Sequence, residues 1–136
     1  MPVFLDTNIF LYAVGGPHPE RAACSRLLQR VGEGSLDATV NTEVLQELLY
    51  VLTRRGRRQE ALKLASDVAA LFPDLLPVTR DDILMACDLI RKHTRLSVRD
   101  ALHAATMLRN GLRTIVSVDL DFDQISEIRR LAPGSA

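Results

Sequence analysis

Short apolar runs alternate along the chain with longer segments in which apolar residues recur every three or four positions. Runs rich in apolar and β-branched residues predict three buried strands: Val3–Leu5, Ala38–Asn41 and Thr114–Val118. A fourth run, Leu76–Val78, contains Pro77, and proline is tolerated mainly in edge strands. We therefore predict an edge strand at this position.

The segments with helical spacing are longer than the predicted strands and make up most of the chain. They predict six helices: Ile9–Val14, His18–Gly32, Thr42–Arg54, Gln59–Leu71, Asp81–His93 and Val98–Arg109. From Ile125 onward the pattern favours a short helix, and a final strand near Ile128–Leu131 is the alternative. Because short strands separated by helices are typical of parallel sheets, we predict an α/β fold with a mainly parallel central sheet.

The chain has the length and composition of one globular domain. Its 136 residues are 47% hydrophobic and 25% charged, with 17 basic and 17 acidic side chains. These values exclude a disordered tail and a basic nucleic-acid arm, and the zero net charge gives no electrostatic support for nucleic-acid binding. Since no repeat or linker interrupts the pattern, we predict one domain over residues 1–132 and a frayed tail over 133–136.

The sequence favours a cytoplasmic protein without a membrane segment. The first residues lack the positive charge of a signal peptide, and no apolar run approaches the ~20 residues that span a bilayer. Cys24 and Cys87 lie in separate helical segments and form no CxxC motif. We therefore predict that both are small buried apolar residues in a reducing compartment.

Two aspartates directly follow predicted strands. Asp6 comes after Val3–Leu5, and Asp119 comes after Thr114–Val118. Since ligands of open α/β sheets bind at the carboxyl ends of the strands, the two carboxylates could share one cleft. Each also has a local alternative, because Asp6 could cap the next helix and Asp119 could stabilise a turn.

Two predicted helices could bring further carboxylates to that cleft. At about 100° per residue, Glu47 flanks the apolar stripe of its helix, whereas Glu43 is expected to lie further round toward solvent. Asp100 flanks small and apolar positions, although Ser97 three residues earlier also fits a capping box. Carboxylates that converge in a desolvated cleft repel one another unless a cation neutralises them. Their oxygen ligands suit Mg²⁺ or Mn²⁺, which can promote phosphodiester cleavage.

At these residues the sequence resembles the PIN-domain family, and in particular its single-domain VapC-type toxin ribonucleases. The resemblance rests on four stretches in the family's order and spacing: Phe4–Asn8, Thr42–Leu48, Asp100–Ala105 and Val116–Asp123. It implies a three-layer α/β/α sandwich and a Mg²⁺- or Mn²⁺-dependent endoribonuclease that hydrolyses RNA phosphodiester bonds with metal-activated water. It also implies a homodimer, and similarity to toxins implies a cognate antitoxin protein that blocks the acidic cleft.

The family's catalytic and metal-binding carboxylates match four positions of this chain: Asp6, Glu47, Asp100 and Asp119. Asn8 matches the polar residue that supports the first aspartate, and Ser117 stands where the family has a serine or threonine hydroxyl. Asp121 and Asp123 match an acidic tail around the last aspartate and form a secondary group.

Other polar residues leave alternatives open. One basic cluster consists of Arg54, Arg55, Arg57 and Arg58. These side chains could contact the RNA backbone, or their positive charges could stabilise a helix C-terminus. His103 follows Asp100 by three residues and is expected to be a packed, hydrogen-bonded side chain rather than a ligand or base. The alternative to an enzyme is a non-catalytic PIN-like module that binds RNA or protein. The complete set of acids argues against it, because a binding module has no need to concentrate negative charge.

Overall fold

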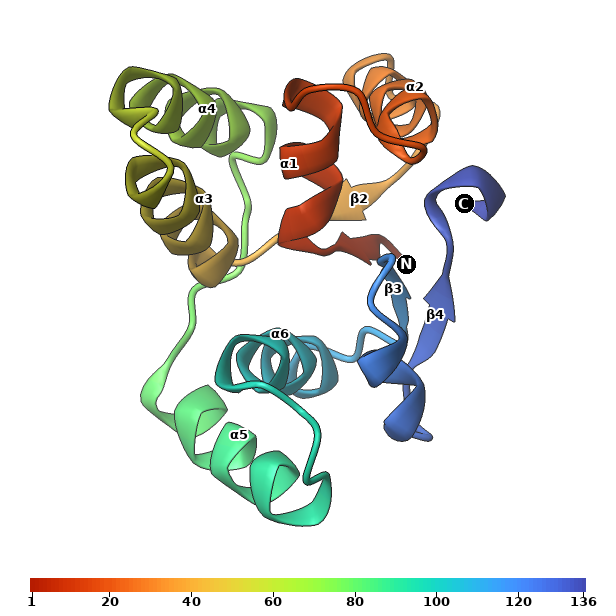
Figure 1. Ribbon diagram of the computed structural model, residues 1–136. Helices are drawn as coiled ribbons and strands as arrows, with labels where there is room; N and C mark the ends of the chain where they lie inside the picture. The colour runs from red at the N-terminus through yellow and green to blue at the C-terminus, as the bar shows by residue number, and fades with distance from the viewer.

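A parallel four-stranded sheet with the order β2-β1-β3-β4 lies at the centre of the computed structural model, which describes residues 1–136 (Figure 1). The strands are β1 (Val3–Leu5), β2 (Ala38–Thr39), β3 (Thr114–Val116) and β4 (Arg129–Leu131). All three strand pairs are parallel, and Leu5 of β1 lies opposite Val116 of β3. The carboxyl ends of the two central strands therefore lie side by side.

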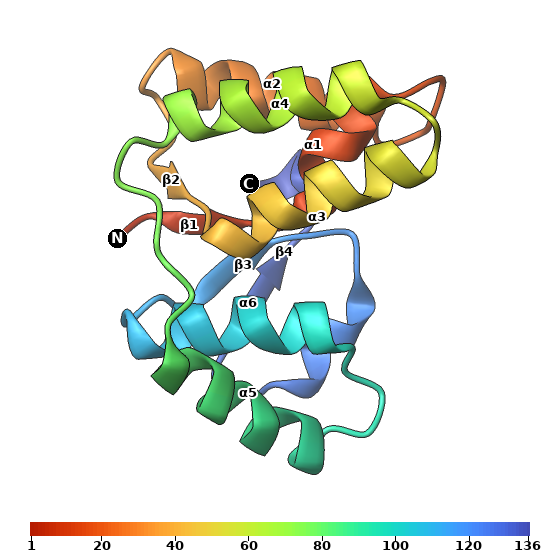
Figure 2. The ribbon, with the colours of Figure 1, turned by 90° about the vertical axis from the view of Figure 1, so that its left-hand side faces the viewer.

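Six helices cover the two faces of this sheet. They are α1 (Thr7–Val14), α2 (Arg21–Gly32), α3 (Thr42–Arg54), α4 (Arg58–Leu71), α5 (Arg80–Lys92) and α6 (Val98–Arg109). Figure 2 shows α1 to α4 on one side of the sheet and α5 and α6 on the other. This arrangement confirms the predicted three-layer α/β/α fold and the mainly parallel sheet. None of the helices has both the length and the hydropathy that a membrane span requires.

The helix that positions Glu47 is fixed at its start by a buried asparagine. The Asn41 side chain accepts a hydrogen bond from the Val44 N–H at 3.0 Å, which caps α3. Its amide group donates to Thr106 Oγ1 of α6 at 3.2 Å. One side chain thus caps α3 and joins it to α6 across the end of the sheet, and α3 spans the predicted residues.

Two predictions about strands need correction. The segment Leu76–Val78 forms a single bridge between Leu76 and Asn41 rather than an edge strand. The segment after Ile125 forms the strand β4, which was the alternative, and the helix predicted there is wrong. A short 3-10 helix, η1 (Leu120–Gln124), precedes it. Ile125 and Ile128 are buried in the core, so the apolar spacing that suggested a helix comes from a turn whose two isoleucines pack into the core.

The cysteines and the last residues also differ from expectation. Cys24 is buried as predicted, but Cys87 is exposed on α5, and neither forms a disulfide. The predicted frayed tail instead forms a 3-10 turn, η2 (Pro133–Ser135). Pro133 is buried, and Arg30 of α2 donates a hydrogen bond to the main-chain oxygen of Ala136 at 2.6 Å. These contacts hold the segment against α2.

Candidate active site

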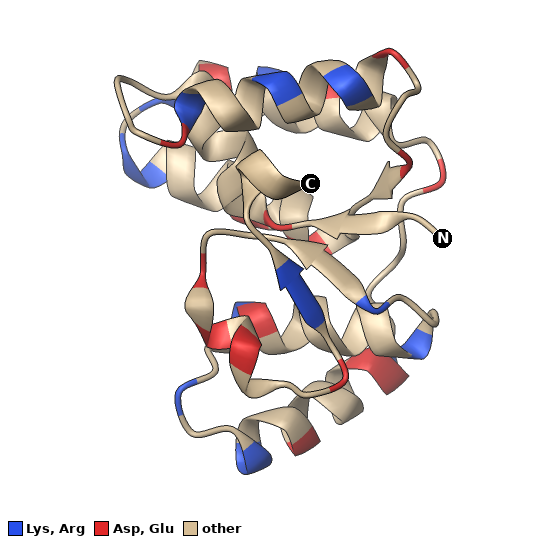
Figure 3. Cartoon of the chain, turned by 90° about the vertical axis from the view of Figure 1, so that its right-hand side faces the viewer, with Lys and Arg blue, Asp and Glu red and all other residues tan.

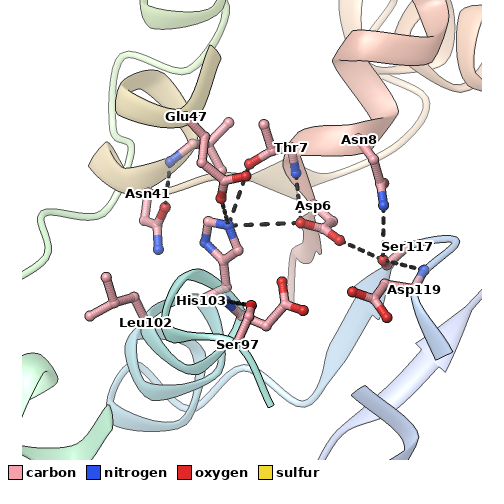
Figure 4. A network of polar contacts seen from close by, with 12 residues as sticks. Asp6, Thr7, Asn8, Asn41, Glu47, Ser97, Leu102, His103, Ser117 and Asp119 are labelled. Carbon is pink, nitrogen blue, oxygen red and sulfur yellow. Dashed lines mark hydrogen bonds and ion pairs between the residues drawn. The ribbon is translucent and has the colours of Figure 1, made fainter. Parts of the chain in front are cut away.

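Ser117 connects the two aspartates that follow the central strands (Figure 4). Its hydroxyl donates a hydrogen bond to Asp6 Oδ2 at 2.5 Å and accepts one from the Asp119 N–H at 2.9 Å. The Asp6 N–H in turn donates to the carbonyl of Val116 at 3.1 Å. The pairing of β1 with β3 therefore brings Asp6 and Asp119 to one end of the sheet, as the positions of the strands predicted.

Asp6 is both a helix cap and a site carboxylate. Its Oδ1 accepts a hydrogen bond from the Thr7 N–H at 2.8 Å, which caps α1. The carboxylate is buried, and this burial raises its pKa above the usual range. Asn8, the second residue of α1, donates to Ser117 Oγ at 3.5 Å. The capping alternative for Asp6 is thus confirmed, and the same carboxylate also lies near Glu47 and Asp100.

Glu47 reaches the same end of the sheet from α3, where His103 of α6 holds its carboxylate. His103 Nε2 lies 2.8 Å from Glu47 Oε1 and 3.7 Å from Asp6 Oδ1. The ring is fully buried, with its centroid 5.4 Å from that of Phe4. The expectation of a packed, hydrogen-bonded histidine is confirmed. Its position three residues after Asp100 indicated that it could reach the same site, but its partners Glu47 and Asp6 were not predicted.

Asp100 lies in the first turn of α6 and faces the other carboxylates. Ser97 caps the helix by accepting a hydrogen bond from the Asp100 N–H at 3.1 Å. Only this half of the predicted capping box forms, so the Asp100 carboxylate is not used by the cap. Burial, a hydrogen bond with Asp119 and the charges of Asp6 and Glu47 raise the pKa of Asp100 to about 9. Asp100 therefore interacts with each of the other three predicted acids.

Asp121 joins the site, whereas Asp123 does not. Carboxylate oxygens of Asp100, Asp119 and Asp121 all lie within 4.8 Å of one another. The Asp123 carboxylate instead pairs with Arg130 Nε of β4 at 3.0 Å. Figure 3 shows acidic segments gathered beyond the ends of the central strands. A set of three oxygen donors under mutual repulsion fits a hard divalent cation such as Mg²⁺ or Mn²⁺.

Glu43 was expected to face solvent, and this expectation is wrong. Glu43 lies one turn before Glu47 on α3, and residues four apart share a helix face. Its side chain is half-buried, and burial together with the charge of Glu47 raises its pKa. Glu43 therefore contributes negative charge at the rim of the acidic site.

The four arginines of the basic cluster occupy two different helix ends. Arg54 lies in the last turn of α3, and Arg55 is its C-cap, as the helix-end alternative predicted. Arg57 occupies the N-cap position of α4 without a side-chain capping bond and pairs with Glu60, with its Nε 2.9 Å from Oε1. Arg58 is the first residue of that helix. Figure 3 shows this turn on the same side of the molecule as the acidic segments. Stabilisation of a helix C-terminus by these cations thus explains Arg54 and Arg55, and it does not explain Arg57 and Arg58 at the start of α4.

Residues 3–128 match the model of the family described as PIN domain. Ribonuclease VapC13 of Mycobacterium tuberculosis is 35% identical over 131 residues, which cover 96% of this chain and 99% of the relative. Ribonuclease VapC23 of the same species is 33% identical over 117 residues, which cover 86% of this chain and 92% of the relative.

Solved structures with the same fold include toxins of bacterial toxin–antitoxin systems. The M. tuberculosis toxin VapC20, described as cleaving the sarcin-ricin loop, has a TM-score of 0.76 and 21% identity, and the match covers 91% of this chain and 95% of that chain. FitAcB from Neisseria gonorrhoeae has a TM-score of 0.72 and 18% identity, with 96% of this chain and 97% of that chain covered. At these identities the likeness establishes the fold.

Proposed function

The chain belongs to the PIN domain family, and from this premise we propose that it is a divalent-metal-dependent endoribonuclease that hydrolyses RNA phosphodiester bonds. Its similarity to VapC ribonucleases over 96% of the chain supports this proposal. The single observation that carries it is that four carboxylates converge at one end of the sheet, two from the segments after β1 and β3 and two from α3 and α6: Asp6, Asp119, Glu47 and Asp100.

These four acids are the proposed catalytic and metal-binding residues. Asp100 and Asp119, together with Asp121, would hold the cation, because their oxygens lie within 4.8 Å of one another. Mg²⁺ or Mn²⁺ bound there would activate water as a Lewis acid and neutralise charge on the scissile phosphate. Asp6 and Glu47 are fixed by hydrogen bonds to Ser117 and His103, so their oxygens can accept a proton from water at defined positions.

We further propose the partners that the relatives suggest. The structural neighbours from toxin–antitoxin systems support a toxin with a cognate antitoxin, which would cover the acidic site. We propose that this toxin acts in the cytoplasm. We also propose a homodimer. The arginines of the α3–α4 turn would add sequence-independent affinity for the RNA backbone. Arg57 would contribute least, because it is partly buried and Glu60 already pairs with it.

Cleavage of structured RNAs by the purified protein tests the central proposal. We expect cutting with Mn²⁺ or Mg²⁺, none with EDTA, and none by the Asp100→Asn variant. Asp123→Asn is the matched control, because Asp123 is an aspartate of the same acidic stretch that pairs with Arg130. It should cut at the normal rate. Cutting that persists in Asp100→Asn would reject the site assignment. A folded protein that does not bind Mn²⁺ and does not cleave RNA would favour a non-catalytic module.

A further inference from the structure

A cavity of about 340 Å³ is lined in part by Asn8, whose side chain also binds Ser117 at the acidic site. It is formed by the outer face of α1, the loop from α1 to α2 and Arg55 at the end of α3. Figure 2 shows the α1–α2 loop and the α3–α4 turn at the same end of the molecule. A cavity of this size is within the range of small-ligand pockets, and the proposed catalytic acids do not account for it.

Asn8 connects this cavity to the acidic site. Its side chain lines the cavity and also donates to Ser117, whose hydroxyl binds Asp6. Tyr12 lines the cavity one helical turn further along α1, a rise of about 6 Å. A ligand in the cavity would therefore be a neighbour of a phosphate group placed at Asp6.

Two aromatic rings form one wall of the cavity. The rings of Tyr12 and His18 are stacked, with centroids 4.1 Å apart and an interplanar angle of 15°. His18 Nδ1 accepts a hydrogen bond from the Glu20 N–H at 3.1 Å, which fixes the ring and leaves the proton on Nε2. Tyr12 covers one face of the exposed His18 ring. The other face and the Nε2–H are available to a flat ligand such as a nucleobase.

The charge of the cavity is opposite to that of the acidic site. No aspartate or glutamate lines it, and Arg55 lines it without an ion-pair partner. By contrast, Arg57 two residues later is paired with Glu60. A guanidinium group binds phosphate well through its fork of N–H donors. The cavity thus combines a stacking surface with an uncompensated cation.

We propose that this cavity is an RNA subsite that binds one unpaired nucleotide next to the scissile phosphate. The base stacks on His18, and Arg55 binds the phosphate of the same nucleotide. Because every base has a flat face, this subsite selects single-stranded character more than base identity. The proposal rests on the proposed ribonuclease function and defines the substrate as RNA with an unpaired nucleotide beside the cleavage site.

Binding in EDTA tests the subsite separately from catalysis. The probe is a fluorescein-labelled single-stranded RNA of about 12 nucleotides, followed by fluorescence anisotropy. We expect His18→Ala and Arg55→Gln each to weaken binding about tenfold, and His18→Phe, which keeps a stacking face, to weaken it less than about threefold. His93→Ala and Arg113→Gln are matched controls outside the cavity and should bind like the parent protein. A 2-aminopurine base in the probe should be quenched by the parent and by His18→Phe, and not by His18→Ala.

Other results would overturn the subsite in distinguishable ways. If the protein cleaves and binds RNA while His18→Ala and Arg55→Gln behave like the controls, the subsite is wrong and the ribonuclease stands. If the parent protein neither cleaves nor binds RNA, both proposals fail together. If the two variants bind RNA normally but lose affinity for a co-expressed antitoxin, the cavity is a protein-binding site.

Discussion

His103 Nε2 lies 2.8 Å from Oε1 of Glu47 and joins α6 to α3 at the acidic site. The His103 ring is fully buried, and its Nδ1 has no hydrogen-bond partner. Because an ionised carboxylate can only accept a hydrogen bond, Nε2 carries the proton that it shares with Glu47. Glu47, which is 14% exposed, is thereby held in one orientation toward Asp6. His103 acts through Glu47 as a positioning residue.

Replacing His103 with phenylalanine should loosen Glu47 while keeping a ring of similar size in the core. We expect Mn²⁺ affinity and RNA cleavage to fall about 10- to 100-fold, as is usual when the partner of a metal-site carboxylate is lost. His103→Gln keeps a side-chain N–H and should recover part of both. Isothermal titration with Mn²⁺ and initial cleavage rates measure these effects. Equal losses in the two variants would mean that His103 has a packing role alone.

Asp100 should make the metal-free protein less stable as the pH rises. Burial, the hydrogen bond with Asp119 and the nearby charges raise its pKa from 3.8 to about 9. Between these values the folded protein keeps a proton that the unfolded chain has lost, so the free energy of unfolding falls from about pH 4 to about pH 9. Burial also raises the pKa of Asp6, which acts in the same direction.

Asp100→Asn should therefore stabilise the metal-free protein at about pH 8 by at least about 1 kcal/mol, since one pKa unit corresponds to roughly that energy. Melting temperatures in EDTA, measured across the pH range, check this result. The variant should show a flatter pH profile, and Asp123→Asn should keep the parent's profile. A variant less stable than the parent at every pH would indicate that Asp100 contributes mainly to the start of α6.

Ser117→Ala should destabilise the fold as well as the site. The substitution removes the hydroxyl that donates to Asp6 Oδ2 and leaves the Asp119 N–H without its acceptor. Because Ser117 is fully buried, water does not replace these bonds, and we expect a loss of about 1–3 kcal/mol. Urea unfolding measures it as a lower midpoint at constant slope. The exposed Ser126→Ala is the control, and an equally small change in both would contradict the bridging role.

The sequence was most informative where a local pattern coincides with burial. The helix Thr42–Arg54 has an apolar stripe and a capping asparagine, and its predicted bounds agree with the structure. The strand-end positions of Asp6 and Asp119 also predicted their approach, because parallel strands end at one edge of the sheet. The prediction from helix angles, that Glu43 faces solvent, was wrong. Residues four apart lie on the same side of a helix, so Glu43 is on the same side of α3 as Glu47.

Contacts between distant residues could not be predicted from local patterns. Nothing near His103 in the sequence indicates Glu47, which lies 56 residues away in the chain. Asp121 and Asp123 look equivalent in the sequence. In the structure both lie in η1, but the Asp123 carboxylate pairs with Arg130 of β4, whereas that of Asp121 lies near Asp100 and Asp119. The strand β4 itself is short and carries two arginines, so its pairing with β3 decided its structure more than its own composition.

The different surroundings of Asp121 and Asp123 lead to a prediction about metal binding. Asp121 contributes an oxygen within 4.8 Å of those of Asp100 and Asp119, whereas Asp123 is neutralised by Arg130. A divalent ion that binds only the folded protein stabilises it, by about 2.7 kcal/mol at a concentration of 100 times its Kd. We therefore expect Mn²⁺ to raise the melting temperature of the parent protein and EDTA to reverse the change.

Asp121→Asn should lose most of this Mn²⁺-dependent stabilisation, because it replaces a charged ligand of the three-carboxylate group with a neutral one. Asp123→Asn has the same change of chemistry two residues away and should keep it. Differential scanning calorimetry over a series of Mn²⁺ concentrations separates a loss of affinity from a loss of stability in the metal-free state. If both variants lost the Mn²⁺-dependent stabilisation equally, Mn²⁺ would be bound through the net negative charge of the acidic stretch. A defined site at Asp100, Asp119 and Asp121 requires the two to differ, because only one of them faces the other carboxylates.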